Sequence, residues 1–152
     1  MTTEDKKRSK PSVLDLDRQI CHSLYSASNA LVRAYRPLLE GIDLTYPQYV
    51  VMMSLWQRDG VSISDLVQHT RLDAGTLTPL LRRLQSKRLV DIEVADSDER
   101  RRVVSLTRRG RALKGSAEQI PGQIACAVDM PAEDAVKLKA LCEDLLSRLA
   151  SD

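Results

Sequence analysis

Cys21 is the residue whose surroundings in the sequence most favour chemistry. It lies about two turns into a segment with helical periodicity, with Arg18 three residues before it and His22 beside it. The positive end of the helix dipole and the nearby guanidinium would both favour a thiolate, which attacks a peroxide to give a sulfenic acid. A lone cysteine on an amphipathic helix is more often a small packing residue, so both interpretations stay open at this point.

The few aromatic residues give Cys21 possible partners. The chain has four tyrosines, one tryptophan and no phenylalanine, and Tyr25 and Tyr35 share the helical stripe of Cys21. Phenol hydroxyls can donate hydrogen bonds to a thiolate, and their rings can surround an organic group. Tyr25 is one turn away and can reach Cys21 within the helix. Tyr35 is roughly 21 Å away along a straight helix, so only an antiparallel partner helix could bring it to the thiol.

Basic residues gather in the middle of the chain. Residues 71–114 contain 12 Lys and Arg against 6 Asp and Glu, a local balance of +6, whereas the remaining residues balance to −4. This distribution is typical of a phosphate-binding module on a neutral scaffold. By charge alone, a solvated basic face would look the same.

A helix over residues 74–87 is expected to present part of this charge. Its leucines repeat at i, i+3, i+4 and i+7 after Asp73, which turns small, hydrogen-bonding and cationic side chains to the opposite face. In a major groove, arginine can reach phosphates or guanine edges, and threonine can reach phosphates or thymine methyl groups. The alternative is an ordinary surface helix, with some kink at its proline. The outward-facing residues are Gly75, Thr76, Thr78, Pro79, Arg82, Arg83 and Ser86.

A β-hairpin follows this helix. Apolar residues alternate from Val90 to Val94 and resume at Val104 after a polar turn around residues 96–99. Three arginines cluster at the return, which suits phosphates or a minor groove better than it suits fold stability. Asp98 is placed to orient the first of them. The three arginines are Arg100, Arg101 and Arg102.

The remaining periodicity completes a mainly helical fold. Apolar residues at helical spacing from Val13 to Leu38 predict a long amphipathic helix that is ended by Pro37. A capping box at Thr45 opens the next helix, and Ser62 or Ser64 caps a short third one. Helices resume at Thr107, break at residues 121–122, and continue to a last helix opened by Pro131. A helix-turn-helix followed by a basic hairpin is a winged helix. We expect a disordered tail over residues 1–12 and a single domain over 13–152, in which 13–40 and 108–150 are dimerisation helices and 45–107 the winged helix.

Several classes of protein are disfavoured by the sequence. Three widely spaced cysteines make no disulfide framework, and neither they nor the two histidines have zinc-ligand spacing. We therefore expect no metal and no cofactor. We also expect no membrane span and no signal peptide, and thus a cytoplasmic protein. Cys142, between Leu138 and Leu145 of the last helix, is expected to be a packing residue.

The hairpin carries a family resemblance. Asp98 and Arg100, followed by Leu106, Thr107 and Gly110, resemble the wing signature of the MarR family of bacterial regulators, a D-x-R followed by L-T-x-x-G. The resemblance extends over residues 14–149. It implies a triangular homodimer that places two winged helices on a pseudopalindromic operator in double-stranded DNA. It also implies that Asp98 and Arg100 are the wing pair and that residues 74–87 form the recognition helix.

Other stretches resemble one branch of that family, the organic hydroperoxide-sensing OhrR type. They are residues 24–28, 33–39, 44–49 and 72–81. The resemblance implies that Cys21 is the peroxidatic cysteine and that Tyr35 and Tyr46 of the partner subunit hydrogen-bond its sulfur. It further implies the two-cysteine subclass, in which Cys126 is the resolving thiol of an intersubunit disulfide with Cys21.

The sequence thus predicts a homodimeric repressor, not an enzyme, that releases DNA when an organic hydroperoxide oxidises Cys21. Two alternatives remain. One is a repressor released by a small phenolic ligand, with incidental cysteines. The other is a thiol peroxidase that uses Cys21 catalytically, against which stand the basic wing and the absence of a thioredoxin-like βαβ pattern.

Overall fold

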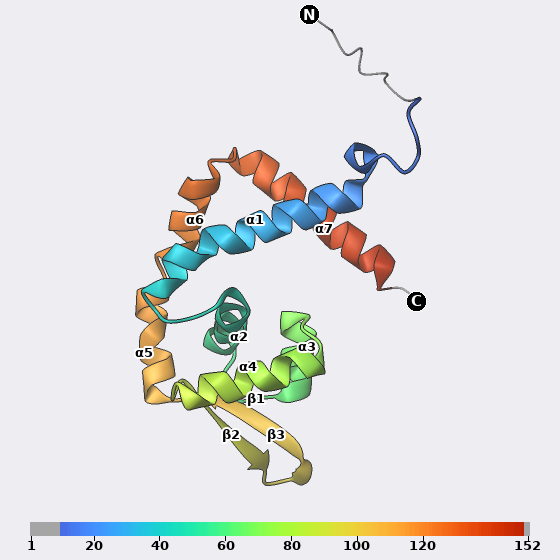
Figure 1. The fold of residues 1–152 in the computed structure, drawn as a ribbon. Helices are drawn as coiled ribbons and strands as arrows, with labels where there is room; N and C mark the ends of the chain where they lie inside the picture. The colour runs from blue at the N-terminus through green and yellow to red at the C-terminus, as the bar shows by residue number, and fades with distance from the viewer. Residues whose placement is uncertain (1–9, 151–152) are drawn as a thin grey trace, which may run out of the picture. The chain divides into compact units, whose positions relative to one another are not determined.

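The computed structural model describes residues 10–150, and Figure 1 shows its elements. Residues 1–9 of the expected N-terminal tail lie outside the described residues. The chain divides into two compact units, the first ending at Arg33 and the second beginning at Ala34. The elements are a 3-10 turn at Leu16–Arg18, α1 (Ile20–Glu40), α2 (Tyr46–Gln57), β1 (Val61–Ser62), α3 (Ile63–Thr70), α4 (Ala74–Ser86), β2 (Val90–Ala95), β3 (Asp98–Leu106), α5 (Arg108–Ala117), α6 (Ile120–Val128) and α7 (Ala132–Leu149).

The start of α1 differs from the expected one. The helix begins at Ile20 rather than at Val13, so Cys21 lies in its first turn and not two turns inside it. The Gln19 side chain closes the preceding turn by donating to the carbonyls of Val13 and Asp15, at 2.7 and 3.1 Å. The apolar side chains before α1 are exposed in this chain, Val13 at 83%. Their periodicity therefore did not indicate a helix.

The end of α1 also differs. The helix continues through Pro37 to Glu40 instead of ending at the proline. Burial explains the extension, because Leu39 is 1% exposed and its carbonyl accepts from the backbone N–H groups of Ile42 and Leu44. The buried side chain thus fixes the last turn despite the hydrogen bond that Pro37 cannot make.

The core of the second unit is built from the expected apolar faces. All four leucines of the α4 stripe are buried, and they pack with Val51, Met52 and Leu55 of α2. Four helices begin at side chains that accept from a backbone N–H three residues later, which satisfies a donor that the helix leaves free. These caps are Thr45, Ser62, Asp73 and Thr107.

The sheet contains a strand that the sequence did not predict. The expected hairpin is present, with a turn at Asp96 and Ser97, but β1 adds a third strand and gives the antiparallel order β1-β3-β2. Val61 of β1 and Ile92 of β2 both pair with Val104. A strand of two residues has no periodicity to detect. β1 leads directly into α3 and so connects the hairpin to that helix. In Figure 1 the hairpin projects below α3.

The C-terminal helices break at another place than predicted. The break between α5 and α6 falls at Glu118 and Gln119, and Pro121 lies in the first turn of α6. Proline is tolerated there because its missing N–H is one that the helix does not use. Beyond α6, Pro131 precedes α7 as expected. The leucines on one face of α7 are exposed: Leu138, Leu141, Leu145 and Leu149.

Gly110 is required where α5 approaches Leu89, in the segment between α4 and β2. A Cβ atom at this position would lie 2.1 Å from the carbonyl oxygen of Leu89, a backbone atom that cannot turn away. We expect Gly110→Ala to lower the free energy of unfolding by about 1–3 kcal/mol. Thermal unfolding measures this, with Gly115→Ala as the control, since nothing lies within 4 Å of its added Cβ. Equal melting temperatures for the two variants would contradict the close approach.

Candidate functional site

The outer face of α4 carries the predicted reading surface. The seven residues predicted to face outward are all exposed, opposite the buried leucines. The Thr76 hydroxyl donates to Asp73 at 2.9 Å, and the Thr78 hydroxyl donates to the carbonyl of Ala74 at 3.0 Å. Both threonines therefore keep an oxygen lone pair and a methyl group for a partner, while Arg82 and Arg83 supply the charge. The helix is continuous through Pro79.

Asp73 positions the beginning of α4. Its carboxylate accepts from the backbone N–H and the hydroxyl of Thr76, and these hydrogen bonds hold the pKa of the carboxyl below its ordinary value of 3.8. A lowered pKa stabilises the fold above pH 3.8, and this stabilisation is lost as the pH falls through the folded-state pKa.

We therefore expect Asp73→Ala to lower the melting temperature at pH 7, with the difference from wild type shrinking as the pH falls below 3.8. Thermal unfolding across this pH range measures the difference. Asp73→Asn, which can still cap the helix, is the control. A difference for Asp73→Ala that stays constant down to about pH 2 would contradict the role of the carboxylate.

Asp98, the aspartate of the hairpin, hydrogen-bonds to the backbone. Asp98 was expected to orient the Arg100 side chain, but its carboxylate accepts from the backbone N–H of Arg100 at 2.9 Å, which fixes the hairpin turn instead. No ion pair joins the two side chains within residues 10–150. Sequence spacing places Asp98 near Arg100 but does not distinguish the guanidinium from the peptide N–H.

The three wing arginines differ in their surroundings. Arg101 pairs with Asp65 of α3 at 3.7 Å, and Asp65 itself accepts from the Ser62 hydroxyl at 2.8 Å. Hydrogen bonds from Ser62, and then the Arg101 charge, hold the pKa of the Asp65 carboxyl below its usual range. Arg102, by contrast, faces α4 across a hollow of about 310 Å³ that Arg82 also lines.

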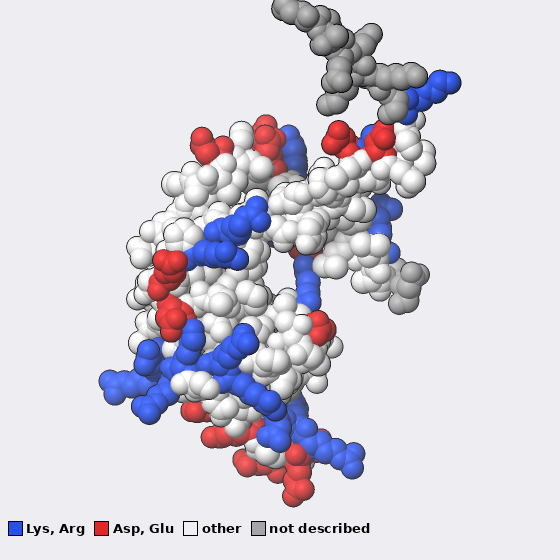
Figure 2. Space-filling model, in the orientation of Figure 1, with Lys and Arg blue, Asp and Glu red and all other residues white. Residues whose placement is uncertain are grey.

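The basic side chains form a surface that is continuous between α4 and the base of the hairpin. Figure 2 shows Lys and Arg over these elements, while Asp and Glu gather toward the hairpin tip. Such a surface suits a polyanion that touches α4 and the hairpin together.

The three thiols are all exposed. Cys21 lies in the first turn of α1, Cys126 in α6 and Cys142 in α7. Cys142, expected to be a packing residue, is exposed in the single chain together with the leucine face of α7. Tyr25, the candidate partner of Cys21 on the same helix, is 69% exposed.

Tyr35 and Tyr46, the other candidate partners of a thiol, lie together in the second unit. Their ring centroids are 4.8 Å apart, and Tyr49 joins them at 5.9 Å from Tyr35. Burial, and then the neighbouring phenols, raise the pKa of Tyr35 above its ordinary value of 10.0. Its hydroxyl therefore stays protonated and able to donate a hydrogen bond. Tyr49 is buried in the core, at 2% exposed, and its ring packs against this pair.

Lys87 is a connecting residue that the sequence did not single out. It caps the C-terminal end of α4, and its ammonium group reaches the Gln48 side chain at 3.3 Å and the Asp43 carboxylate at 3.3 Å. Gln48 in turn caps Thr45, immediately before Tyr46. These contacts tie α4 to α2, the helix that carries Tyr46. A lysine after a helix gives no sequence signal for such a contact.

The described part of the chain has neither a cluster of metal-ligating side chains nor a membrane-spanning helix. Residues 10–150 contain no group of three or more potential metal-ligating side chains. No helix among them is long and apolar enough to cross a membrane.

Comparisons with known proteins agree with this arrangement. Residues 33–116, more than half of the chain, match a family model described as the transcriptional regulator SarA/Rot. The organic hydroperoxide resistance transcriptional regulator of Bacillus subtilis (strain 168) is 35% identical over 136 residues, which span 90% of this chain and 92% of that protein.

Solved structures share the fold. Reduced AbfR bound to DNA, the AbfR protein being from Staphylococcus epidermidis, is 27% identical with a TM-score of 0.74, and the match covers 90% of this chain and 96% of that one. Disulfide-formed AbfR is 27% identical with a TM-score of 0.60, covering 88% and 89%. BpsR of Bordetella bronchiseptica, whose DNA binding is regulated by 6-hydroxynicotinic acid, is 25% identical with a TM-score of 0.80, covering 94% and 100%.

Proposed function

Because this chain belongs to the MarR family of winged-helix transcriptional regulators, we propose that it is a DNA-binding repressor that senses organic hydroperoxides through Cys21. The observation that carries the proposal is the exposed thiol of Cys21 in the first turn of α1, where a hydroperoxide can reach the sulfur. The Bacillus subtilis relative, a regulator of organic hydroperoxide resistance, supports the inducer class.

The active species is a homodimer. Large apolar side chains on α1 and α7 are exposed in the single chain, among them Ile20 at 78% and Leu141 at 67%. A second copy of the chain would cover both helices and bring Tyr35 and Tyr46 of one subunit to Cys21 of the other. Tyr35 and Cys21 lie roughly 21 Å apart along one helix and cannot meet within a chain. If the two α1 helices pack antiparallel, Tyr35 of one subunit lies next to Cys21 of the other.

The dimer binds a pseudopalindromic operator. In each half-site α4 enters the major groove with Thr76, Thr78, Pro79, Arg82, Arg83 and Ser86, while the wing follows the backbone with Arg100 and Arg102. Asp98 holds the wing turn, and Arg101 stays close enough to Asp65 to position the hairpin. The two recognition helices must lie about 34 Å apart to match one turn of DNA.

Oxidation removes the dimer from DNA. The Cys21 thiolate attacks the terminal oxygen of the hydroperoxide, which breaks the O–O bond and gives a sulfenic acid and, after protonation, an alcohol. The Cys126 thiol of the other subunit then attacks the sulfenic sulfur, forming a disulfide and releasing water. The peroxide accepts the two electrons that the two thiols lose. Loss of the thiolate and of its tyrosine contacts shifts the subunits, so the recognition helices leave the operator spacing.

Fluorescence anisotropy tests this function. A DNA site selected from a random pool by the reduced protein is titrated before and after stoichiometric cumene hydroperoxide, and again after dithiothreitol. We expect the peroxide to release the DNA and the reductant to restore binding. Binding that peroxide does not change would contradict the proposal.

The ligand-released alternative has one observation in its favour. A mainly apolar hollow of about 380 Å³ lies between α2 and the α5–α6 segment, lined by Tyr49, Met53, Trp56 and Lys114 among others. Together with the regulation of BpsR by 6-hydroxynicotinic acid, it supports a small aromatic ligand as a second candidate inducer. Peroxide-insensitive DNA binding that such a ligand abolishes would establish this function instead.

A further inference from the structure

The turn between α3 and α4 sets the position of the recognition helix. Arg71 ends α3 in the left-handed backbone conformation, with φ at 61°, and its N–H donates to the carbonyl of Val67 at 2.9 Å. Only Leu72 separates it from Asp73, the residue that caps α4. In a turn this short, a displacement of Arg71 is passed on to the beginning of α4.

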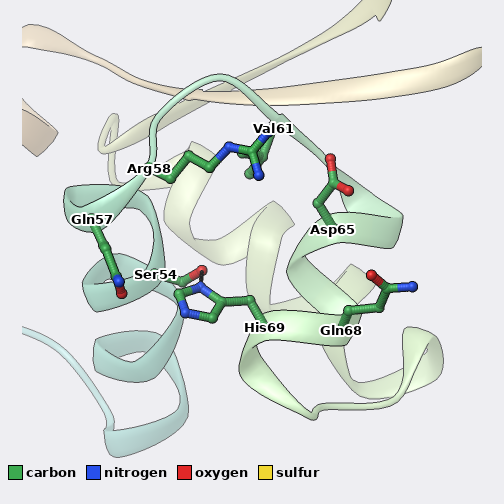
Figure 3. Close-up of a pocket in the computed structure, with 7 residues that line it drawn as sticks. All are labelled: Ser54, Gln57, Arg58, Val61, Asp65, Gln68 and His69. Carbon is green, nitrogen blue, oxygen red and sulfur yellow. Dashed lines mark hydrogen bonds between the residues drawn. The ribbon is translucent and has the colours of Figure 1, made fainter.

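Side-chain hydrogen bonds hold the end of α3 against α2. A 2.6 Å hydrogen bond joins the hydroxyl of Ser54, which is 6% exposed, to Nδ1 of His69 in the last turn of α3. Figure 3 shows the imidazole beside Ser54, between the two helices. The Thr70 hydroxyl then accepts from the N–H of Leu72 at 3.3 Å. The backbone on both sides of Arg71 is therefore held in place by its neighbours.

The turn is also joined to α7, by an ion pair between residues that are 72 positions apart. The Arg71 guanidinium donates to both carboxylate oxygens of Glu143, at 3.1 and 2.8 Å. Hydrogen bonds from Arg71 hold the pKa of the Glu143 carboxyl below its ordinary value of 4.5. Lys139, on α7 itself, lies 3.7 Å from the same carboxylate. Two parallel hydrogen bonds fix the relative orientation of Arg71 and Glu143, which most pairs of exposed charges do not achieve.

This ion pair connects the helix-turn-helix to a helix of the proposed dimer interface. None of the residues of α7, all of which the structure describes, is buried in the single chain. The exposed leucines of α7 are among those that a second copy of the chain would cover. In the dimer α7 is held by the other subunit, so Glu143 gives the turn a fixed point of attachment. The spacing of the two recognition helices, about 34 Å for one turn of DNA, then depends on the pair.

We propose that Glu143 is a positioning residue for DNA binding, which acts through Arg71 to hold the recognition helix in the orientation that the operator requires. The inference rests on the DNA binding proposed for α4 and not on the chemistry of Cys21. It predicts an effect of unexpected sign. Replacing the carboxylate with a neutral amide makes the protein more positive, which by itself would tighten binding to DNA, whereas loss of the positioning contact weakens binding to the operator.

Glu143→Gln tests this role against a matched control, Glu133→Gln. Glu133 also lies on α7, where it pairs with Lys137 at 3.8 Å, so its substitution removes the same charge without changing the turn. Fluorescence anisotropy of the reduced protein measures the affinity for the selected DNA site and for a scrambled sequence of the same length. We expect Glu143→Gln to bind the selected site about fivefold more weakly or worse and the scrambled DNA no more weakly than the wild type does. Glu133→Gln should weaken neither.

A double-mutant cycle tests whether Glu143 acts through Arg71. Arg71→Gln removes a positive charge and is expected to weaken binding to both DNA sequences, so it serves as the background. In that background Glu143→Gln should cause no further loss of operator affinity. As a second readout, hydrogen exchange of the Thr76 amide in the first turn of α4 should be faster in Glu143→Gln and unchanged in Glu133→Gln.

Four results would overturn the inference. They are an operator affinity of Glu143→Gln that equals or exceeds that of the wild type, an equal loss with Glu133→Gln, the same loss in the Arg71→Gln background, and a lowered melting temperature with faster exchange throughout the chain, which would indicate general destabilisation. A wild-type protein that binds no DNA from the pool would contradict the proposed function itself, and the inference with it.

Discussion

The Cys21→Ser variant is expected to bind operator DNA as tightly as the wild type and to keep that affinity after treatment with an organic hydroperoxide. Serine replaces sulfur with an oxygen that a peroxide does not oxidise, and Cys21 is exposed at the end of a helix, so the substitution leaves the fold intact. For the wild type, a coupling typical of allosteric proteins predicts that oxidation weakens binding by about 5–150-fold. For the variant the ratio of the two dissociation constants should be about 1.

Matched variants separate this effect from a general loss of thiols. Cys142→Ser removes another exposed cysteine and should respond to peroxide like the wild type. Anisotropy titrations measure the DNA affinity of the wild type, Cys21→Ser and Cys142→Ser, each in its reduced and oxidised form. A Cys21→Ser variant that still releases DNA on oxidation would exclude Cys21 as the sensor.

Arg82→Ala and Arg102→Ala are expected to have the second large effect, a weaker affinity for the operator. The two arginines line one hollow between α4 and β3, so both are placed to meet DNA that contacts the helix and the wing. Removing an arginine that reads a base costs about 1–3 kcal/mol, and a homodimer carries each substitution twice. Where the arginine binds a phosphate, the slope of log affinity against log salt should also become shallower, by about one unit for each phosphate no longer neutralised.

Two other arginines are controls for the contribution of charge alone. Arg109→Ala removes a charge from α5 and is expected to have a small effect. Arg101→Ala is expected to weaken binding less than Arg102→Ala, because Arg101 is paired with Asp65. Equal reductions in affinity for all four variants would contradict the assigned roles and leave only a diffuse electrostatic attraction.

The elements that pack against the core of this chain could be predicted from the sequence. The leucine stripe of α4 is buried as its spacing indicated, and Thr45 and Ser62 cap helices as their side-chain chemistry suggested. Burial on one face and capping are local properties, so periodicity and residue type are sufficient to find them.

The segments outside that core could not be predicted in this way. Val13 and Leu16 continue the apolar spacing of α1, but they precede the helix and are exposed. Apolar spacing alone does not show whether the same chain or a second one buries these side chains. Pro37 lies inside its helix because the burial of Leu39 outweighs its missing hydrogen bond. A two-residue strand such as β1 forms only through pairing with β3.

Part of the candidate site could likewise be predicted from the sequence, and part could not. The outward face of α4 follows directly from helical geometry. The pairing of Arg101 with Asp65 and the contact of Lys87 with Gln48 join residues that are distant in the sequence. No single-sequence pattern reports these contacts.

The most direct test of the central claim is the covalent state of the oxidised protein. Wild type, Cys21→Ser, Cys126→Ser and Cys142→Ser are treated with stoichiometric cumene hydroperoxide and examined by non-reducing gel electrophoresis and intact mass. We predict a disulfide-linked dimer for the wild type and for Cys142→Ser, and none for the other two variants. A wild-type protein that stays monomeric on the gel with an unmodified Cys21 would contradict the redox mechanism.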